Sequence, residues 1–148
     1  MSIDELYQDL IIDHHRHPRC PGPVERPSAS ETVYNPLCGD QINLALRTEG
    51  DTICAIGCAG HGCAISQASG SMMAELCQGR TVAEVAGLVG KFRAMMKGEL
   101  PESEAAGLAD AASLAGVRRF PARTRCALLA WEALDLCLKK ESTPGAAG

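Results

Sequence analysis

A cysteine and an aspartate flank a single glycine in the segment Asn35-Pro36-Leu37-Cys38-Gly39-Asp40. Because glycine has no Cβ, the Cys38 thiolate and the Asp40 carboxylate can turn toward one point without a side chain between them. These two groups supply half of a tetrahedral metal site. The other half must come from elsewhere in the chain, and Cys63 and Cys126 are the best candidates.

Cys63 and Cys126 are each expected near the start of a helix. Free backbone N–H groups and the helix dipole favour a thiolate at such positions. Three thiolates and one carboxylate suit tetrahedral Zn²⁺, and thiolates equally suit iron–sulfur ligation. The spacing contains no CxxC pair, so spacing alone leaves open a shared site and a set of inert cysteines.

Composition narrows the classes of function. The chain has 148 residues with a net charge of -4 and a pI near 5.5, and nucleic acid binding needs a basic surface instead. The acidic start, Met1 to Glu5, does not resemble a signal peptide, and no apolar run approaches the roughly 20 residues of a membrane span. We therefore expect no nucleic acid or membrane partner, a cytoplasmic location, and eight reduced cysteines rather than a disulfide framework.

The elements that must position these cysteines follow from periodicity and breaker residues. We expect an α+β fold in one domain, 1–140, with a small three-stranded antiparallel sheet covered by helices. The expected strands are 31–35, 41–48 and 51–58. The expected helices are 4–17, 63–78, one behind the capping box at 81–84, and one from 121 to about 140. A proline-rich loop at 18–30, an inserted excursion at 98–116 and a disordered tail at 141–148 complete the prediction.

Four segments together resemble the SufU branch of the SufU/IscU/NifU-amino-terminal family of iron–sulfur assembly proteins. They are LYQDLIIDHHRHPR, NPLCGD, GHGCAISQASGSMM and FPARTRCALLAW. By this resemblance, Cys38, Asp40, Cys63 and Cys126 fall on the family's metal and cluster ligands. The 98–116 insertion resembles the extra segment of SufU. Arg125 stands where the IscU branch places a histidine, and since arginine cannot ligate a cation, the resemblance assigns the fourth ligand to Asp40.

The resemblance implies a zinc-dependent acceptor of persulfide sulfur. The sulfur would come from a PLP-dependent cysteine desulfurase of SufS type and pass to downstream iron–sulfur assembly machinery. Cys126 is the expected acceptor, and Arg123, which matches the family's PAR-x-x-C pattern, is expected beside it. Cys38 and Cys63 would hold the metal, with Asp40 as a labile ligand. The alternative is an IscU-like scaffold that binds iron and carries a transient [2Fe–2S] cluster on Cys38, Cys63 and Cys126.

Other candidate residues have simpler explanations. His14, His15 and His17 are interpreted as ordinary histidines at a helix C-terminus, and His61 is the histidine that could visit the site. Arg118 and Arg119 are at least as well explained as solvated side chains. Cys54 and Cys58 are expected on one buried strand face, and Cys77 and Cys137 in the core. A deaminase is disfavoured because the chain lacks H-x-E with P-C-x-x-C, and a purely structural zinc remains open.

Overall fold

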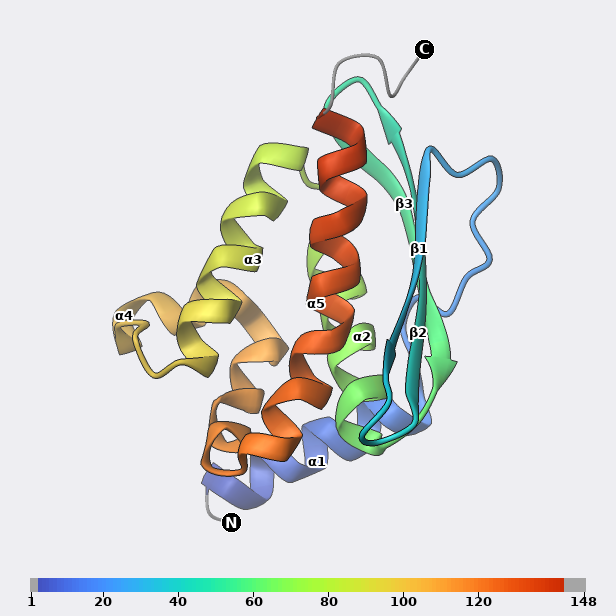
Figure 1. Cartoon of the computed structure of the whole chain (residues 1–148). Helices are drawn as coiled ribbons and strands as arrows, with labels where there is room; N and C mark the ends of the chain where they lie inside the picture. Colours follow the sequence, from blue (N-terminus) through green and yellow to red (C-terminus); the bar gives the residue numbers. More distant parts are fainter. Residues whose placement is uncertain (1–2, 143–148) are drawn as a thin grey trace.

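The computed structural model describes the backbone of residues 3–142 and the side chains of residues 8–141. Three antiparallel strands form one sheet in the order β1-β2-β3 (Figure 1). The strands are β1 (Ala29–Asn35), β2 (Asp40–Glu49) and β3 (Thr52–His61). The helices are α1 (Ile3–Arg16), α2 (Ala64–Cys77), α3 (Val82–Met96), α4 (Glu102–Ala105), the 3-10 helix η1 (Ala106–Arg119) and α5 (Pro121–Ser142). The predicted three-stranded antiparallel sheet with helices is confirmed.

One face of the sheet packs on helices α2 and α5, and the proline-rich loop crosses the other side (Figure 1). Every second residue of β2 from Asp40 to Leu46 is buried, which explains the alternation seen in the sequence. The loop lies directly on the sheet, because a Cβ added at Gly57 would come within 2.8 Å of the Gly22 Cα. The loop therefore covers part of the sheet face opposite to the helices.

A β-bulge corrects one prediction for β3. Arg47 pairs with Ala55 and Thr48 with Ile53, so Cys54 is the extra residue. The extra residue breaks the alternation, and the Cys54 sulfur lies half-buried, 3.4 Å from Nε of Arg47. Cys54 therefore does not share the buried face with Cys58, which is in the core as expected.

The core is built mainly from aliphatic residues, with one aromatic pair at its centre. Phe92 and Trp131 stack with ring centroids 4.3 Å apart, and the Trp131 indole N–H donates to Ser69 Oγ at 3.1 Å. Cys77 and Cys137 are fully buried in the core, as predicted. All eight cysteines are free thiols in this fold.

The inserted excursion folds as α4 followed by η1, and it packs against α1, α2, α3 and α5. The 3-10 helix is interrupted at Ala109, whose φ of 49° lies in the left-handed region. At the other end, α5 continues through Ser142, so Glu141 is helical and bonds Ser28 and Thr48. The rest of the predicted tail, 143–148, lies outside the described residues. Within the described part of the chain, no helix combines the length and apolar character needed to span a bilayer.

Candidate metal centre

A tight turn between β1 and β2 presents Cys38. The Asn35 carbonyl accepts the N–H groups of Cys38 at 3.2 Å and Gly39 at 2.9 Å. Gly39 has a φ of +69°, a conformation that glycine adopts without steric cost. The turn exposes Cys38 and lets Asn35 pair with Asp40 across the strands. Asp40 is 1% exposed, so its carboxylate points into the protein at the mouth of the turn.

The Asp40 carboxylate links the turn to the start of α2. Its Oδ1 accepts the backbone N–H of Cys63 at 2.8 Å, and its Oδ2 lies 3.9 Å from the Cys63 sulfur. Cys63 is the N-cap of α2, and its sulfur accepts the Ser66 N–H at 3.5 Å. Any Cβ at Gly62 would lie 2.1 Å from Asp40 Oδ1, so only glycine admits this approach.

The third element of the site is α5, which contributes Cys126 from its second turn. Its sulfur lies 3.4 Å from the Cys38 sulfur and 3.8 Å from Nδ2 of Asn35. Cys126 has no exposed surface, whereas Cys38 is exposed. Cys126 is near the start of the helix, as expected, because α5 begins at Pro121.

The four predicted ligands converge on one region, although not equally. One ligand atom each of Cys38, Asp40 and Cys126 lie within 4.8 Å of one another, a spacing compatible with a single ion. Cys63 is not in that group and reaches the cluster through its contacts with Asp40. Sulfur and carboxylate donors at this spacing fit Zn²⁺ and equally fit iron. The arrangement thus joins chain segments 88 residues apart at one point.

Hydrogen bonds and charge shape the acid–base chemistry of the cluster. Burial alone would raise the pKa of Asp40, but the Cys63 backbone N–H and neighbouring side-chain donors outweigh it and lower the pKa. Desolvation, reinforced by Asp40 and Cys38, raises the pKa of the Cys126 thiol strongly. A metal ion or another cation must therefore compensate for burial before Cys126 becomes a thiolate.

Arg123 is the cation placed to do so. Cys63 and Cys126, when ionised, raise the pKa of its guanidinium through their charge and through hydrogen bonds to their sulfurs. Arg118 instead donates to the Met95 carbonyl at 3.3 Å, and Arg125 is exposed on α5. His61 is exposed at the end of β3 and does not belong to the three-residue group.

The family described as NifU-like N terminal domain matches residues 6–127, which is most of the chain. The chain belongs to this family. The resemblance inferred from the sequence motifs is thereby confirmed.

Relatives within the NifU-like N-terminal family include both SufU and IscU proteins. The zinc-dependent sulfurtransferase SufU of Bacillus subtilis is 37% identical over 95% of this chain and 94% of its own length. The iron–sulfur cluster assembly scaffold protein IscU of Streptococcus pyogenes is 36% identical over 95% of this chain and 87% of its own length. The crystal structure of FiSufU from Fervidobacterium islandicum AW-1, assigned to the SUF system, has a TM-score of 0.82 at 32% identity, covering 93% of this chain and 99% of that one.

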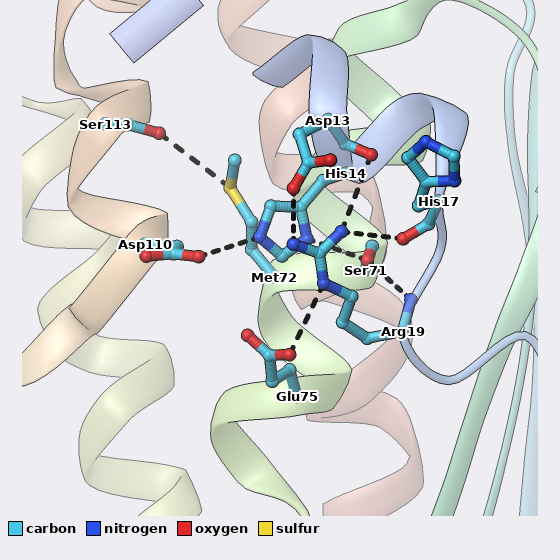
Figure 2. A network of polar contacts seen from close by, with 9 residues as sticks. All are labelled: Asp13, His14, His17, Arg19, Ser71, Met72, Glu75, Asp110 and Ser113. Carbon is cyan, nitrogen blue, oxygen red and sulfur yellow. Dashed lines mark hydrogen bonds and ion pairs between the residues drawn. The ribbon is translucent and has the colours of Figure 1, made fainter. Parts of the chain in front are cut away.

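A second polar cluster is centred on His14 of α1 (Figure 2). His14 is fully buried, with Nδ1 2.8 Å from Ser71 Oγ and Nε2 2.8 Å from Asp110 Oδ2. This corrects the interpretation of His14 as an ordinary helix-end histidine. Glu75 completes a group with metal-ligand spacing, but its carboxylate pairs with Arg19 at 3.5 Å. The cluster is therefore accounted for as a structural link between α1, α2 and η1.

Sequence reasoning missed two roles near the sulfurs. Asn35 was noted only as part of the motif, yet it contacts both the turn and Cys126. Its position directly before Pro36 is a recognised turn signal that predicts the bend but not the contact with sulfur. Gly62 belongs to the segment GHGCAISQASGSMM, and only the fold reveals that Asp40 occupies the space of its missing side chain.

Proposed function

We propose that this protein is a SufU-type, zinc-dependent acceptor of persulfide sulfur in iron–sulfur cluster assembly. The observation that carries the proposal is the convergence of Cys38, Asp40 and Cys126, with one exposed sulfur beside a buried one. The Bacillus subtilis relative supports it, since that protein is a zinc-dependent sulfurtransferase and matches nearly the whole chain.

Cys38, Asp40 and Cys126 would hold the ion, with Cys63 as the fourth donor after a small movement of its side chain. Zinc bound there supplies a positive charge that keeps thiols deprotonated at neutral pH without redox chemistry. Asp40 is the hard oxygen ligand among soft sulfurs, and its hydrogen bond to the Cys63 N–H gives the carboxylate a second partner. It is therefore the ligand best suited to release the ion.

The proposed chemistry is exchange between sulfurs and involves no net oxidation. The Cys126 thiolate attacks the outer sulfur of a persulfide, R–S–SH, on the donor. A new S–S bond forms at Cys126 as the donor's S–S bond breaks. The transferred sulfur keeps its proton, and the electron pair leaves with the donor as R–S⁻. Arg123, whose guanidinium pKa is raised by the neighbouring sulfurs, balances the negative charge that develops on sulfur during this exchange.

Cys38 is the second candidate for the acceptor. Cys126 has no exposed surface, so an incoming persulfide reaches it only if the Cys38 turn moves. Cys38 is already exposed and lies 3.4 Å from Cys126, close enough to receive sulfur first and pass it inward.

The donor matching this chemistry is a PLP-dependent cysteine desulfurase of SufS type acting in the cytoplasm. The acceptor would then serve downstream iron–sulfur assembly machinery. A second candidate function is the scaffold role, in which Cys38, Cys63 and Cys126 carry a transient [2Fe–2S] cluster as cargo. The 36% identity to the Streptococcus pyogenes IscU and the affinity of thiolates for iron favour that alternative.

A desulfurase assay with cysteine as substrate tests the proposal. Wild type should stimulate turnover of the desulfurase and contain one zinc ion per chain. Asp40→Ala and Cys126→Ser should lose most of the stimulation and most of the bound zinc. Cys54→Ser, which changes a half-buried thiol outside the site, is the matched control and should behave as wild type. A colourless protein that stimulates turnover supports the carrier. A protein that does not stimulate it, but gains a visible cluster that activates an apo-protein, overturns the proposal in favour of the scaffold.

A further inference from the structure

Asn35 is a buried residue that contacts both the backbone of the Cys38 turn and the sulfur of Cys126. Its carbonyl accepts the N–H groups of Cys38 and Gly39, and its side-chain Oδ1 accepts the Leu37 N–H at 3.3 Å. Its Nδ2 donates to the Cys126 sulfur at 3.8 Å. Asn35 itself is 5% exposed, so these contacts are sheltered from water. One residue thus ties the exposed turn on β1 to the buried thiol on α5.

The amide side chain suits this double role. An asparagine offers an acceptor and two donors from one planar group, so it can hold the turn with oxygen and a sulfur with nitrogen. Aspartate has the same shape but, when ionised, only accepts. Alanine makes neither contact. The two substitutions therefore separate the N–H···S contact from the support of the turn.

We propose that Asn35 is a positioning residue that locks the Cys126 sulfur beneath the Cys38 turn and so determines which of the two thiols meets an incoming electrophile. In the locked arrangement Cys126 is covered and Cys38 is exposed. Loss of the amide removes the bond to the Leu37 N–H and the contact with the Cys126 sulfur, which loosens the turn over Cys126 and opens a path to it, while the backbone bonds of the Asn35 carbonyl remain. The part of the inference that concerns sulfur transfer rests on the proposed function. The part that concerns the burial of Cys126 is independent of that function.

Alkylation of the metal-free protein measures directly how accessible Cys126 is relative to Cys38. After chelator treatment, N-ethylmaleimide should modify Cys38 first in the wild type, and peptide mass spectrometry should give the rate ratio of Cys126 to Cys38. Asn35→Ala should raise this ratio about ten-fold or more. Asn43→Ala, which removes an exposed asparagine of β2, should leave it unchanged. A ratio in Asn35→Ala within two-fold of wild type, or an equal rise in both variants, overturns the inference.

Cobalt spectroscopy tests the N–H···S contact with the turn left in place. Asn35→Asp keeps an acceptor for the Leu37 N–H but removes the donor to sulfur. With Co²⁺ in the cysteine site, losing that donor should shift the thiolate-to-metal charge-transfer band to longer wavelength, because the sulfur regains electron density. A merely structural role predicts no shift in Asn35→Asp, and that result would count against the inference even if Asn35→Ala failed to fold.

Persulfide mapping separates this inference from the proposed function. After desulfurase turnover, the ratio of persulfide on Cys126 to that on Cys38 should rise in Asn35→Ala. If no cysteine of the wild type acquires persulfide, the sulfur-acceptor proposal fails, whereas the alkylation ratio still decides the role of Asn35. If persulfide forms with the same distribution in wild type and Asn35→Ala, the positioning role fails and the acceptor proposal stands.

Discussion

The sulfur atoms of Cys38 and Cys126 lie 3.4 Å apart across 88 positions of the chain. One belongs to the turn between β1 and β2 and the other to α5, so the pair forms only when the last helix docks against the sheet. Metal bound by both would stabilise this docking, because a ligand that binds only the folded state shifts the unfolding equilibrium.

We expect zinc to raise the free energy of unfolding by about 2.7 kcal/mol when free zinc is 100 times its dissociation constant. Cys38→Ser should lose most of this gain, and Cys54→Ser should keep it. Urea unfolding with fluorescence of the single tryptophan, Trp131, at fixed zinc concentrations measures the effect. Equal stabilisation of the two variants would mean that the ion binds elsewhere.

Gly62→Ala should damage the metal site more than the fold. The new Cβ would lie 2.1 Å from Asp40 Oδ1, and the φ of +139° is unfavourable for alanine, so Asp40 must move. We expect a loss of about 1–3 kcal/mol in stability and at least a ten-fold weaker zinc affinity. Gly50→Ala is the control, because Gly50 has a φ of +64° in open space. Calorimetric titration should show the affinity loss in the first variant alone.

His14→Ala should destabilise the fold through α1. The side chain is fully buried and its two ring nitrogens contact Ser71 and Asp110, so its removal leaves both partners to find water or each other (Figure 2). We expect a loss of about 2–4 kcal/mol, as for other broken buried networks. His15→Ala, one position on and exposed, should change stability by less than about 0.5 kcal/mol. Urea unfolding of both variants provides the comparison, and equal effects would contradict a linking role for His14.

Local patterns predicted the strands and the capped helices because their causes are local. The alternation of Ile42, Leu44 and Leu46 follows from burial of one sheet face. Thr81 and Glu84 form the predicted capping box, in which each side chain accepts the other residue's backbone N–H. The capping box joins residues three positions apart and the alternation repeats every two, so a short window of sequence contains both patterns.

The features that sequence reasoning missed depend on distant partners. Cys54 is not on the buried face as predicted, because Arg47 of the neighbouring strand pairs with Ala55 and Cys54 becomes the extra residue of a β-bulge. His14 is buried because Asp110 of the insertion reaches it, 96 positions away. The cysteine site itself was predicted by family motifs, since no local rule brings α5 to the Cys38 turn.

Asp135 should make stability depend on pH at the contact between α3 and α5. Burial would raise its pKa, but hydrogen bonds from Lys139 and Arg93 outweigh it and hold the pKa below the ordinary 3.8. A lowered pKa in the folded state stabilises the protein above the unfolded value, and the contribution is lost as pH falls through the folded value. The relevant window therefore lies below about pH 3.8.

Asp135→Asn should cost at most about 1 kcal/mol at pH 7, because the pair with Arg93 at 3.2 Å is partly exposed and screened. The difference from wild type should shrink as pH falls below about 3.8, where the wild-type carboxylate also becomes neutral. Urea midpoints at pH 7 and at several acidic pH values measure both variants. Glu132→Gln, which changes an exposed carboxylate on the same helix, should show no such convergence. A difference that persists unchanged into acid would assign the effect of Asp135→Asn to packing rather than to charge.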